Sequence, residues 1–258
     1  DPYSMLPAPC SPLLNAFTID VEDYYQVSAF ESHISRDDWE RHDSRVVPST
    51  QRLLRLLKRH EVRATFFVLG WVAERHPDLV REIHEAGHEI GSHGYWHRLI
   101  YDQTPEEFRE DVCRSRDLLE GITRESVTAY RAPSFSIIER SRWALNVLAE
   151  EGFSIDSSIY PIHHDRYGMP DAQPHLHRIE TSAGSLWEFP PSSVRAGGKN
   201  VPVGGGGYFR LYPLRLTSRW LGRINTKRQQ PFMFYIHPWE VDPEQPRVKA
   251  GTRLSQFR

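Results

Sequence analysis

The sequence predicts a parallel α/β protein, and within that class a distorted or incomplete (β/α) barrel. Short apolar segments rich in β-branched residues alternate with amphipathic segments of helical period, which is typical of strands joined by helices. About seven strand candidates occur, close to the number in a complete barrel, and an open doubly wound sheet is the alternative. With 258 residues, 39% of them hydrophobic, we expect one domain over residues 13–258 after an N-terminal extension of residues 1–12.

The first part of the chain alternates strand and helix in this way. Residues 13–20 are apolar and predict a strand. A helix is expected from Thr50, the predicted N-cap, because the leucines that follow it recur at helical spacing. Residues 63–70 predict the next strand, and a helix begins at Pro77 and ends at Gly87.

The second part continues the pattern. Thr104 and Glu107 form a capping box with Pro105 at the first helical position, which predicts a helix that runs to about Gly121. The run of four glycines at 204–207 predicts either a tight turn or a loop that approaches a ligand, with neither favoured. The other predicted elements are strands over 88–92, 126–132, 153–158, 185–191 and 231–238, and a helix over 140–151.

Composition excludes some functions. A formal net charge of -2 gives no reason to expect nucleic acid or an anionic membrane as partner. The two cysteines, Cys10 and Cys113, provide no disulfide framework, and no apolar run approaches the roughly 20 residues that span a bilayer. The N-terminus lacks a signal-peptide pattern, so we expect a cytoplasmic location, and we interpret residues 1–4 as an expression scar before a natural start at Met5.

His93 and His97 are the first candidate site residues. Spacing of four brings two side chains to one face of a helical turn, where both rings could reach one ion. Gly94 stands where a helical zinc peptidase has its glutamate base, so the third ligand and the base must come from elsewhere. Among 13 histidines such a pair also arises by chance, and we interpret His84 and His88 as a structural pair of this kind.

Other candidates follow the predicted strands. Catalytic side chains of a (β/α) barrel lie at the carboxyl ends of its strands. Asp20, Glu22 and Asp23 follow the first strand; alone they favour a solvated loop, but beside the histidine pair they favour a cation site. Arg131 is expected to pair with one of these carboxylates, and His237, at the end of the last strand, is expected to be an acid or a base.

Three aromatic residues follow late strands. Trp187, Tyr208 and Trp239 have faces that could stack on sugar rings, and core packing explains each of them equally well. Glu188 is expected either to line the same pocket or to stand at its rim.

Taken in order, these residues resemble a known family. The series Asp20 to Asp23, His93-x-x-x-His97, Arg131-x-Pro133, Asp156 and Ile236-His237 resembles the five motifs of the polysaccharide deacetylases, the NodB-type enzymes of carbohydrate esterase family 4. TIDVEDYYQVSAFE, GGGGYFRLYP and HPWE further resemble a branch associated with bacterial exopolysaccharide biosynthesis, close to allantoinase-like members.

The resemblance implies a distorted (β/α) barrel with one divalent metal ion. Zinc is favoured, and cobalt, nickel or manganese are alternatives. It implies that Asp23, His93 and His97 are the metal ligands. Independently, two histidines and one carboxylate leave positions open for water and substrate, as a catalytic zinc requires.

The resemblance also implies catalytic roles. Asp20 matches the base that takes a proton from the attacking water, and Arg131 would orient it. His237 matches the acid that protonates the departing amine, with Asp156 as its pairing partner. These roles amount to hydrolysis of an amide by a base and an acid on opposite sides.

Departures from the family pattern bear on ligand and substrate. The family commonly has two adjacent aspartates, whereas Val21 and Glu22 stand between Asp20 and Asp23 here. In a strand, alternate side chains point to the same face, so Asp20 and Glu22 would point the same way. Glu22 is therefore the alternative metal ligand to the favoured Asp23. Ser134 replaces the usual tyrosine after Pro133, keeping a backbone N–H but losing an aromatic wall. The tryptophan usual near the fourth motif is also missing, which affects the substrate more than the chemistry.

Three functions follow, in order of preference. The first is a metal-dependent deacetylase acting on N-acetylated amino sugars of a bacterial polysaccharide or its lipid-linked precursor, with an acetylated glycan as partner. The second is an allantoinase-like amidohydrolase that opens a small cyclic amide. The third is a glycan-binding protein without activity, which the intact carboxylates and histidines disfavour.

Overall fold

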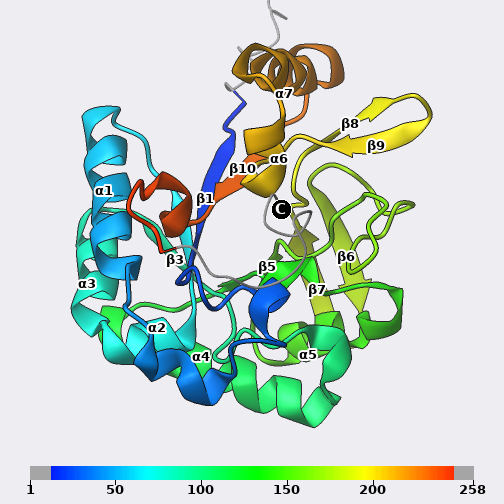
Figure 1. Ribbon diagram of the computed structural model, residues 1–258. Coiled ribbons are helices and arrows are strands. Elements are labelled where there is room, and N and C mark those ends of the chain that lie inside the picture. Colours follow the sequence, from blue (N-terminus) through cyan, green and yellow to red (C-terminus); the bar gives the residue numbers. More distant parts are fainter. Residues whose placement is uncertain (1–12, 247–258) are drawn as a thin grey trace, which may run out of the picture.

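The protein is built around one curled sheet of eight strands, in the order β10-β1-β2-β3-β4-β5-β7-β6 (Figure 1). The computed structural model describes residues 13–246. All neighbouring strands run parallel except β6, which is antiparallel to β7. Strands β10 and β6 form the two edges, so the sheet curls without closing. The predicted distorted or incomplete (β/α) barrel is thus confirmed.

The predictions for residues 1–12 lie outside the described residues. The strands of the sheet are β1 (Ala16–Val21), β2 (Thr65–Val68), β3 (Glu89–Ser92), β4 (Ala129–Tyr130), β5 (Ile155–Asp156), β6 (His177–Thr181), β7 (Gly184–Glu188) and β10 (Met233–Ile236). Strands β8 (Ser193–Ala196) and β9 (Lys199–Pro202) form a separate hairpin. The helices are α1 (Val46–Arg59), α2 (Gly70–Arg75), α3 (Pro77–Glu85), α4 (Pro105–Thr123), α5 (Trp143–Glu150), α6 (Gly206–Leu211) and α7 (Leu214–Arg228).

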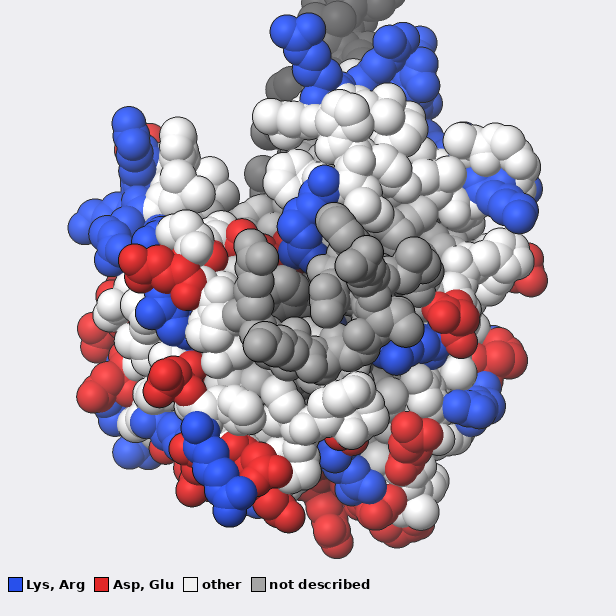
Figure 2. All heavy atoms as spheres, viewed as in Figure 1, with Lys and Arg blue, Asp and Glu red and all other residues white. Residues whose placement is uncertain are grey.

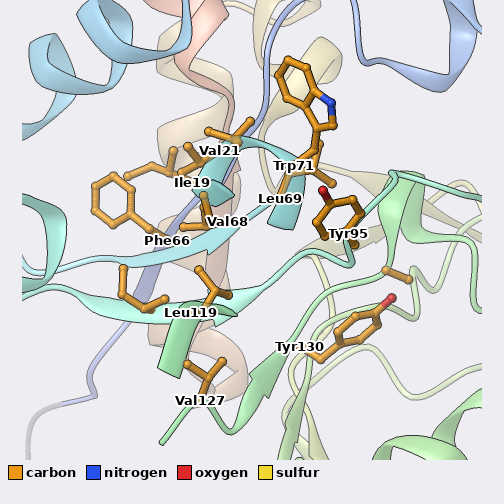
Figure 3. Close-up of a cluster of buried hydrophobic side chains, with 14 of the residues drawn as sticks. Ile19, Val21, Phe66, Val68, Leu69, Trp71, Tyr95, Leu119, Val127 and Tyr130 are labelled. Atoms are coloured by element: carbon orange, nitrogen blue, oxygen red, sulfur yellow. The ribbon is translucent and has the colours of Figure 1, made fainter. Parts of the chain in front are cut away.

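The main core lies between the sheet and helices α1 to α5, which follow its outer side (Figure 1). Figure 3 shows Ile19 and Val21 of β1 beside Phe66 and Val68 of β2, with Leu119 of α4 nearby. All five side chains are buried. Full burial of a side chain of this size stabilises the fold by about 1.5–3 kcal/mol, so this layer fixes the sheet whose rim carries the polar residues.

Local signals account for several element ends. The capping box predicted for α4 is present: the Thr104 hydroxyl accepts from the Glu107 N–H, and the Glu107 carboxylate accepts from the Thr104 N–H. The helix ends at Thr123, two residues beyond the predicted Gly121. Helix α1 was expected from Thr50 but begins at Val46, so Thr50 lies buried inside the helix.

The four glycines permit close backbone approach to β10. A Cβ atom on Gly205, whose φ is +121°, would lie 1.9 Å from the Tyr235 carbonyl oxygen, and one on Gly204 would lie 2.5 Å from the Ser192 nitrogen. Only glycine fits such contacts. The loop therefore packs on the protein's own backbone, and of its glycines Gly207 lines the main cavity.

Acidic and basic side chains are mixed over the lower part of the face shown in Figure 2, whereas basic ones gather near α7 at the top. Cys113 is a free thiol. Within residues 13–246, no helix is both long and apolar enough to cross a membrane.

Candidate active site

The carboxyl ends of four strands bring the candidate residues to one rim. Asp20 and Glu22 come from the end of β1, and His93 follows β3 directly. Arg131 follows β4, and His237 follows β10, which pairs with β1. Parallel strands all end at the same edge, so residues far apart in the sequence meet here.

Glu22, His93 and His97 form the one cluster of metal-ligating side chains found within residues 13–246. One ligand atom from each lies within 4.8 Å of the others, and all three residues are buried. The Nε2 atom of His97 is 2.7 Å from Oε2 of Glu22, and that of His93 is 4.0 Å from it. The carboxylate of the cluster is therefore Glu22, the alternative that strand alternation allowed.

Asp23 was favoured as the third ligand, and the structure corrects this. Its carboxylate accepts hydrogen bonds from the Ser44 hydroxyl at 2.6 Å and from the Arg45 N–H at 2.9 Å. Arg45 is the N-cap of α1, so Asp23 holds the start of that helix, where a carboxylate is stabilised by unpaired N–H groups. This capping also explains why α1 begins before Thr50.

The two histidines lie on a loop and not on a helical turn, which is a second correction. Gly94 and His97 have φ values of +71° and +51°, both left-handed. Asp111 of α4 accepts from the Tyr95 and Trp96 N–H groups at 2.7 and 3.1 Å and so fixes the loop. The expected convergence of the two rings is present, but a turn anchored from α4 produces it.

The protonation states of the cluster fit a divalent cation. The Nδ1–H of His93 donates to the Arg131 carbonyl at 2.8 Å, which leaves its Nε2 lone pair available. Burial lowers the pKa of His93 to about 4, so its ring is neutral. Burial would raise the pKa of Glu22, but His97, then His237 and His93, lower it to about 2.

Two buried atoms of the cluster also have no hydrogen-bond partner among the described residues. They are Oε2 of Glu22 and Nδ1 of His97. The close approach of Glu22 to His97 thus lacks hydrogen-bond geometry. Two imidazoles and one carboxylate form a donor set that suits zinc and similar divalent ions.

Arg131 is fully buried and holds Asp20. Its guanidinium donates to Oδ1 of Asp20 at 2.6 Å, to the Thr18 hydroxyl at 2.8 Å and to the Ser157 hydroxyl at 2.9 Å. It also lies over the Phe67 ring at 4.2 Å. The expected pairing of Arg131 with a rim carboxylate is present, and it fixes Asp20 in one orientation.

His237 pairs with Glu240 and not with the predicted Asp156. Its Nδ1–H donates to Oε1 of Glu240 at 2.6 Å, inside the short helix η6 (Pro238–Val241) and its cap. Burial alone would lower the pKa of His237, but Glu240, with smaller effects from Glu22 and Asp20, raises it to about 9. Its Nε2 is 3.6 Å from Glu22 and 4.0 Å from Asp20.

Asp156 is instead paired with Glu188. The two residues face each other in the β5–β7 register, and both are fully buried. Burial, and then the charge of Asp156, raises the pKa of Glu188 well above its ordinary value, and burial also raises that of Asp156. Burial of the two carboxyl groups side by side therefore favours the protonated form of Glu188. No local pattern in the sequence indicates this pairing, because it depends on which strands become neighbours.

A cavity of about 330 Å³ opens above the cluster. Asp20, Glu22, His93, His97 and His237 contribute its polar part. The remaining lining includes aromatic rings, among them the predicted Tyr208 and Trp239. Trp187, the third predicted aromatic, is half-exposed on β7, away from the cavity lining.

Ser134 lines the cavity next to the cluster. Ser134 and Phe135 both have left-handed φ values, +52° and +51°, in the short helix η4 (Pro133–Phe135). Such conformations are uncommon for residues other than glycine and are found at functional sites. The Ser134 hydroxyl lies 2.5 Å from that of Ser28, so it contacts the short helix η1 (Ser28–Phe30).

The fold is that of the family 4 carbohydrate esterases. A solved structure titled a putative polysaccharide deacetylase from Mycobacterium smegmatis aligns over 87% of this chain and 76% of its own, with 22% identity and a TM-score of 0.59. The family 4 carbohydrate esterase from Streptomyces lividans aligns over 90% and 82%, with 16% identity and a TM-score of 0.53.

Residues 37–153 match the polysaccharide deacetylase family, which the order of the motifs resembles. Residues 157–258 match a domain of unknown function, DUF3473. A peptidoglycan-N-acetylglucosamine deacetylase of Bacillus cereus is 34% identical over 107 residues, 41% of this chain and 38% of that protein. A peptidoglycan deacetylase of Helicobacter pylori is 32% identical over 114 residues, 44% and 37%. The chain thus spans less than two fifths of the length of these two relatives.

Proposed function

We propose that this protein is a metal-dependent deacetylase that hydrolyses the N-acetyl amide of amino sugars in a polysaccharide or its precursor. The observation that carries the proposal is the cluster of Glu22, His93 and His97 beside two groups suited to proton transfer, Asp20 and His237. The match of residues 37–153 to the polysaccharide deacetylases supports it.

The ligand cluster would hold one divalent ion, with zinc favoured. Such an ion, when bound, lowers the pKa of a water molecule and polarises the acyl oxygen of the amide. Glu22, His93 and His97 supply one carboxylate and two imidazoles, and they leave room for water and substrate.

Asp20 would be the general base. Its carboxylate lines the cavity, and Arg131 holds it in place from below. It takes a proton from the water whose oxygen bonds to the acetyl carbon. Ser134 presents a backbone N–H in the position where the family has a tyrosine, and we assign it to the developing negative charge on the acyl oxygen.

His237 would be the general acid. Glu240 favours its protonated form, so the ring can donate a proton to the amide nitrogen as the carbon–nitrogen bond breaks. The products are acetate and a free amine on the sugar.

The size of the cavity favours one second candidate. About 330 Å³ is near the lower end of the range for small-molecule sites, which would also suit an allantoinase-like hydrolase of a small cyclic amide. Release of a ureido acid, and no acetate from glycans, would identify that activity.

The experiment combines metal analysis with acetate release from a chitin tetrasaccharide. We expect one zinc per wild-type chain and measurable acetate. His93→Ala should lose both, whereas Asp20→Asn should keep the metal and lose activity by at least about a hundredfold, the usual contribution of a general base. A wild type that binds no metal after zinc is offered would rule out the proposal.

A further inference from the structure

The segment of unknown function completes the deacetylase fold. Strands β6, β7 and β10, all within residues 157–246, belong to the same sheet as β1 to β5 (Figure 1). Of the fifteen residues that line the cavity, eight come from this segment. The segment therefore forms about half of the lining of the cavity, and its function is to be sought there.

The two halves of the cavity differ in chemistry. Residues before 157 contribute the polar groups at the bottom, Asp20, Glu22 and the two histidines. Apart from His237, the later segment contributes mostly rings and apolar surface, such as Tyr208, Leu211 and Trp239. The reacting amide belongs against the first half, so the unreactive part of the substrate must lie against the second.

The aromatic wall is held rigidly. Tyr160, which is fully buried, packs edge-on against Tyr208 with ring centroids 6.4 Å apart and stacks on Tyr167 at 6.1 Å. The hydroxyls of Tyr167 and Tyr208 are 3.4 Å apart. Trp239 stacks on His237 at 4.6 Å. Rings supported in this way are preorganised, so binding a ligand costs little side-chain entropy.

We propose that the segment 157–246 is the glycan-recognition half of the active site, with Tyr208 and Trp239 as specificity-determining residues. Both rings are half-buried and line the cavity. A pyranose ring has an apolar face of C–H groups that complements such a wall, while its acetamido group extends toward Glu22 and His93. The inference rests on the proposed function and names its substrate class as an N-acetylhexosamine unit.

The test measures binding of a chitin tetrasaccharide to the full chain by calorimetry, together with KM for acetate release. Tyr208→Ala should weaken binding about tenfold and raise KM to a similar extent, since an aromatic contact contributes up to about this factor. Tyr208→Phe keeps the ring and should restore binding. Trp187→Ala removes an exposed ring from the same segment and serves as the matched control, with binding unchanged.

Each outcome separates the two proposals. Equal binding by the wild type and Tyr208→Ala, with both folded by circular dichroism, would overturn the recognition role, as would a wild type that binds no tetrasaccharide. Binding that depends on Tyr208 without any acetate release would uphold recognition and refute the deacetylase. If Tyr208→Ala does not fold, Tyr208→Leu fills the volume without a ring and should show the same loss.

Discussion

The buried pair of Asp156 and Glu188 should make the stability of this protein fall as the pH rises. Burial, and then Asp156, raises the pKa of Glu188 well above its ordinary value of 4.5. The folded chain therefore keeps a proton that the unfolded chain has released. A group whose pKa is raised on folding contributes stability that is complete below its unfolded pKa and is lost as the pH rises through its folded pKa.

Glu188→Gln removes this titration but keeps the shape of the side chain and a donor toward Asp156. A difference of one proton changes the free energy of unfolding by about 1.4 kcal/mol per pH unit. From pH 5 upward, the wild type should therefore lose stability relative to the variant at that rate, until the pH reaches the pKa of Glu188 in the folded chain. Urea denaturation at pH 5, 6 and 7 measures the free energy of unfolding of both proteins.

An exposed glutamate provides the control. Glu180→Gln on β6 changes a side chain that is 73% exposed. The free energy of unfolding of this variant should therefore follow that of the wild type at every pH. If the free energy of unfolding changes with pH in the same way for the wild type and Glu188→Gln, the reasoning is refuted, because Glu188 would then be ionised in the folded chain.

The remaining predictions concern the rim and the glycine loop. Glu240→Gln removes a charge that raises the pKa of His237, so the alkaline limb of activity against pH should move to lower pH; a limb that stays in place would contradict the pairing. Glu22→Gln should lose bound zinc on gel filtration while Asp23→Asn keeps it, and elemental analysis showing the reverse would restore Asp23 as the ligand. Gly205→Ala should destabilise the fold by several kcal/mol in thermal unfolding, because its Cβ would overlap a carbonyl oxygen of β10; an unchanged melting temperature would show that the loop can relax.

The sequence predicted the sheet better than the segments around it. Periodicity and caps identified the parallel strands and the helices α1, α3, α4 and α5, because these signals are local. The antiparallel β6, the β8–β9 hairpin and the helices α2, α6 and α7 were missed. Helix α7 buries only Thr217 and Ile224, and many of its other residues are charged. Its sequence therefore has only a weak apolar pattern of helical period, which is why it was missed.

For the site, the sequence predicted which residues meet but not every pairing. Asp20, His93, His97, Arg131 and His237 do lie at one rim. These residues meet because each lies at or just after the carboxyl end of a parallel strand, and the sequence indicates where those strands end.

The errors concern side-chain partners. Asp23 was assigned to the metal because its motif position resembled a ligand, yet the N–H of Arg45 competes for its carboxylate. Asp156 was paired with His237, yet Glu240 lies only three residues from that histidine and reaches it through a capping turn. Both errors arise because a carboxylate binds the nearest donor, and the nearest donor depends on the folded backbone.

The pairing of β10 with β1 has a consequence for how the protein acquires activity. Thr18 and Met233, in contact across these strands, are 215 residues apart in the chain. Contacts between residues so far apart in the sequence cost more loop-closure entropy than local contacts and form more slowly, so the first and last strands should join late. Because His237 follows β10, the cluster of Glu22, His93 and His97 can form before His237 arrives beside it. Under the proposed function, an incompletely folded chain would then be able to bind a cation without cutting amides, and hydrolysis would begin only when the whole sheet has assembled.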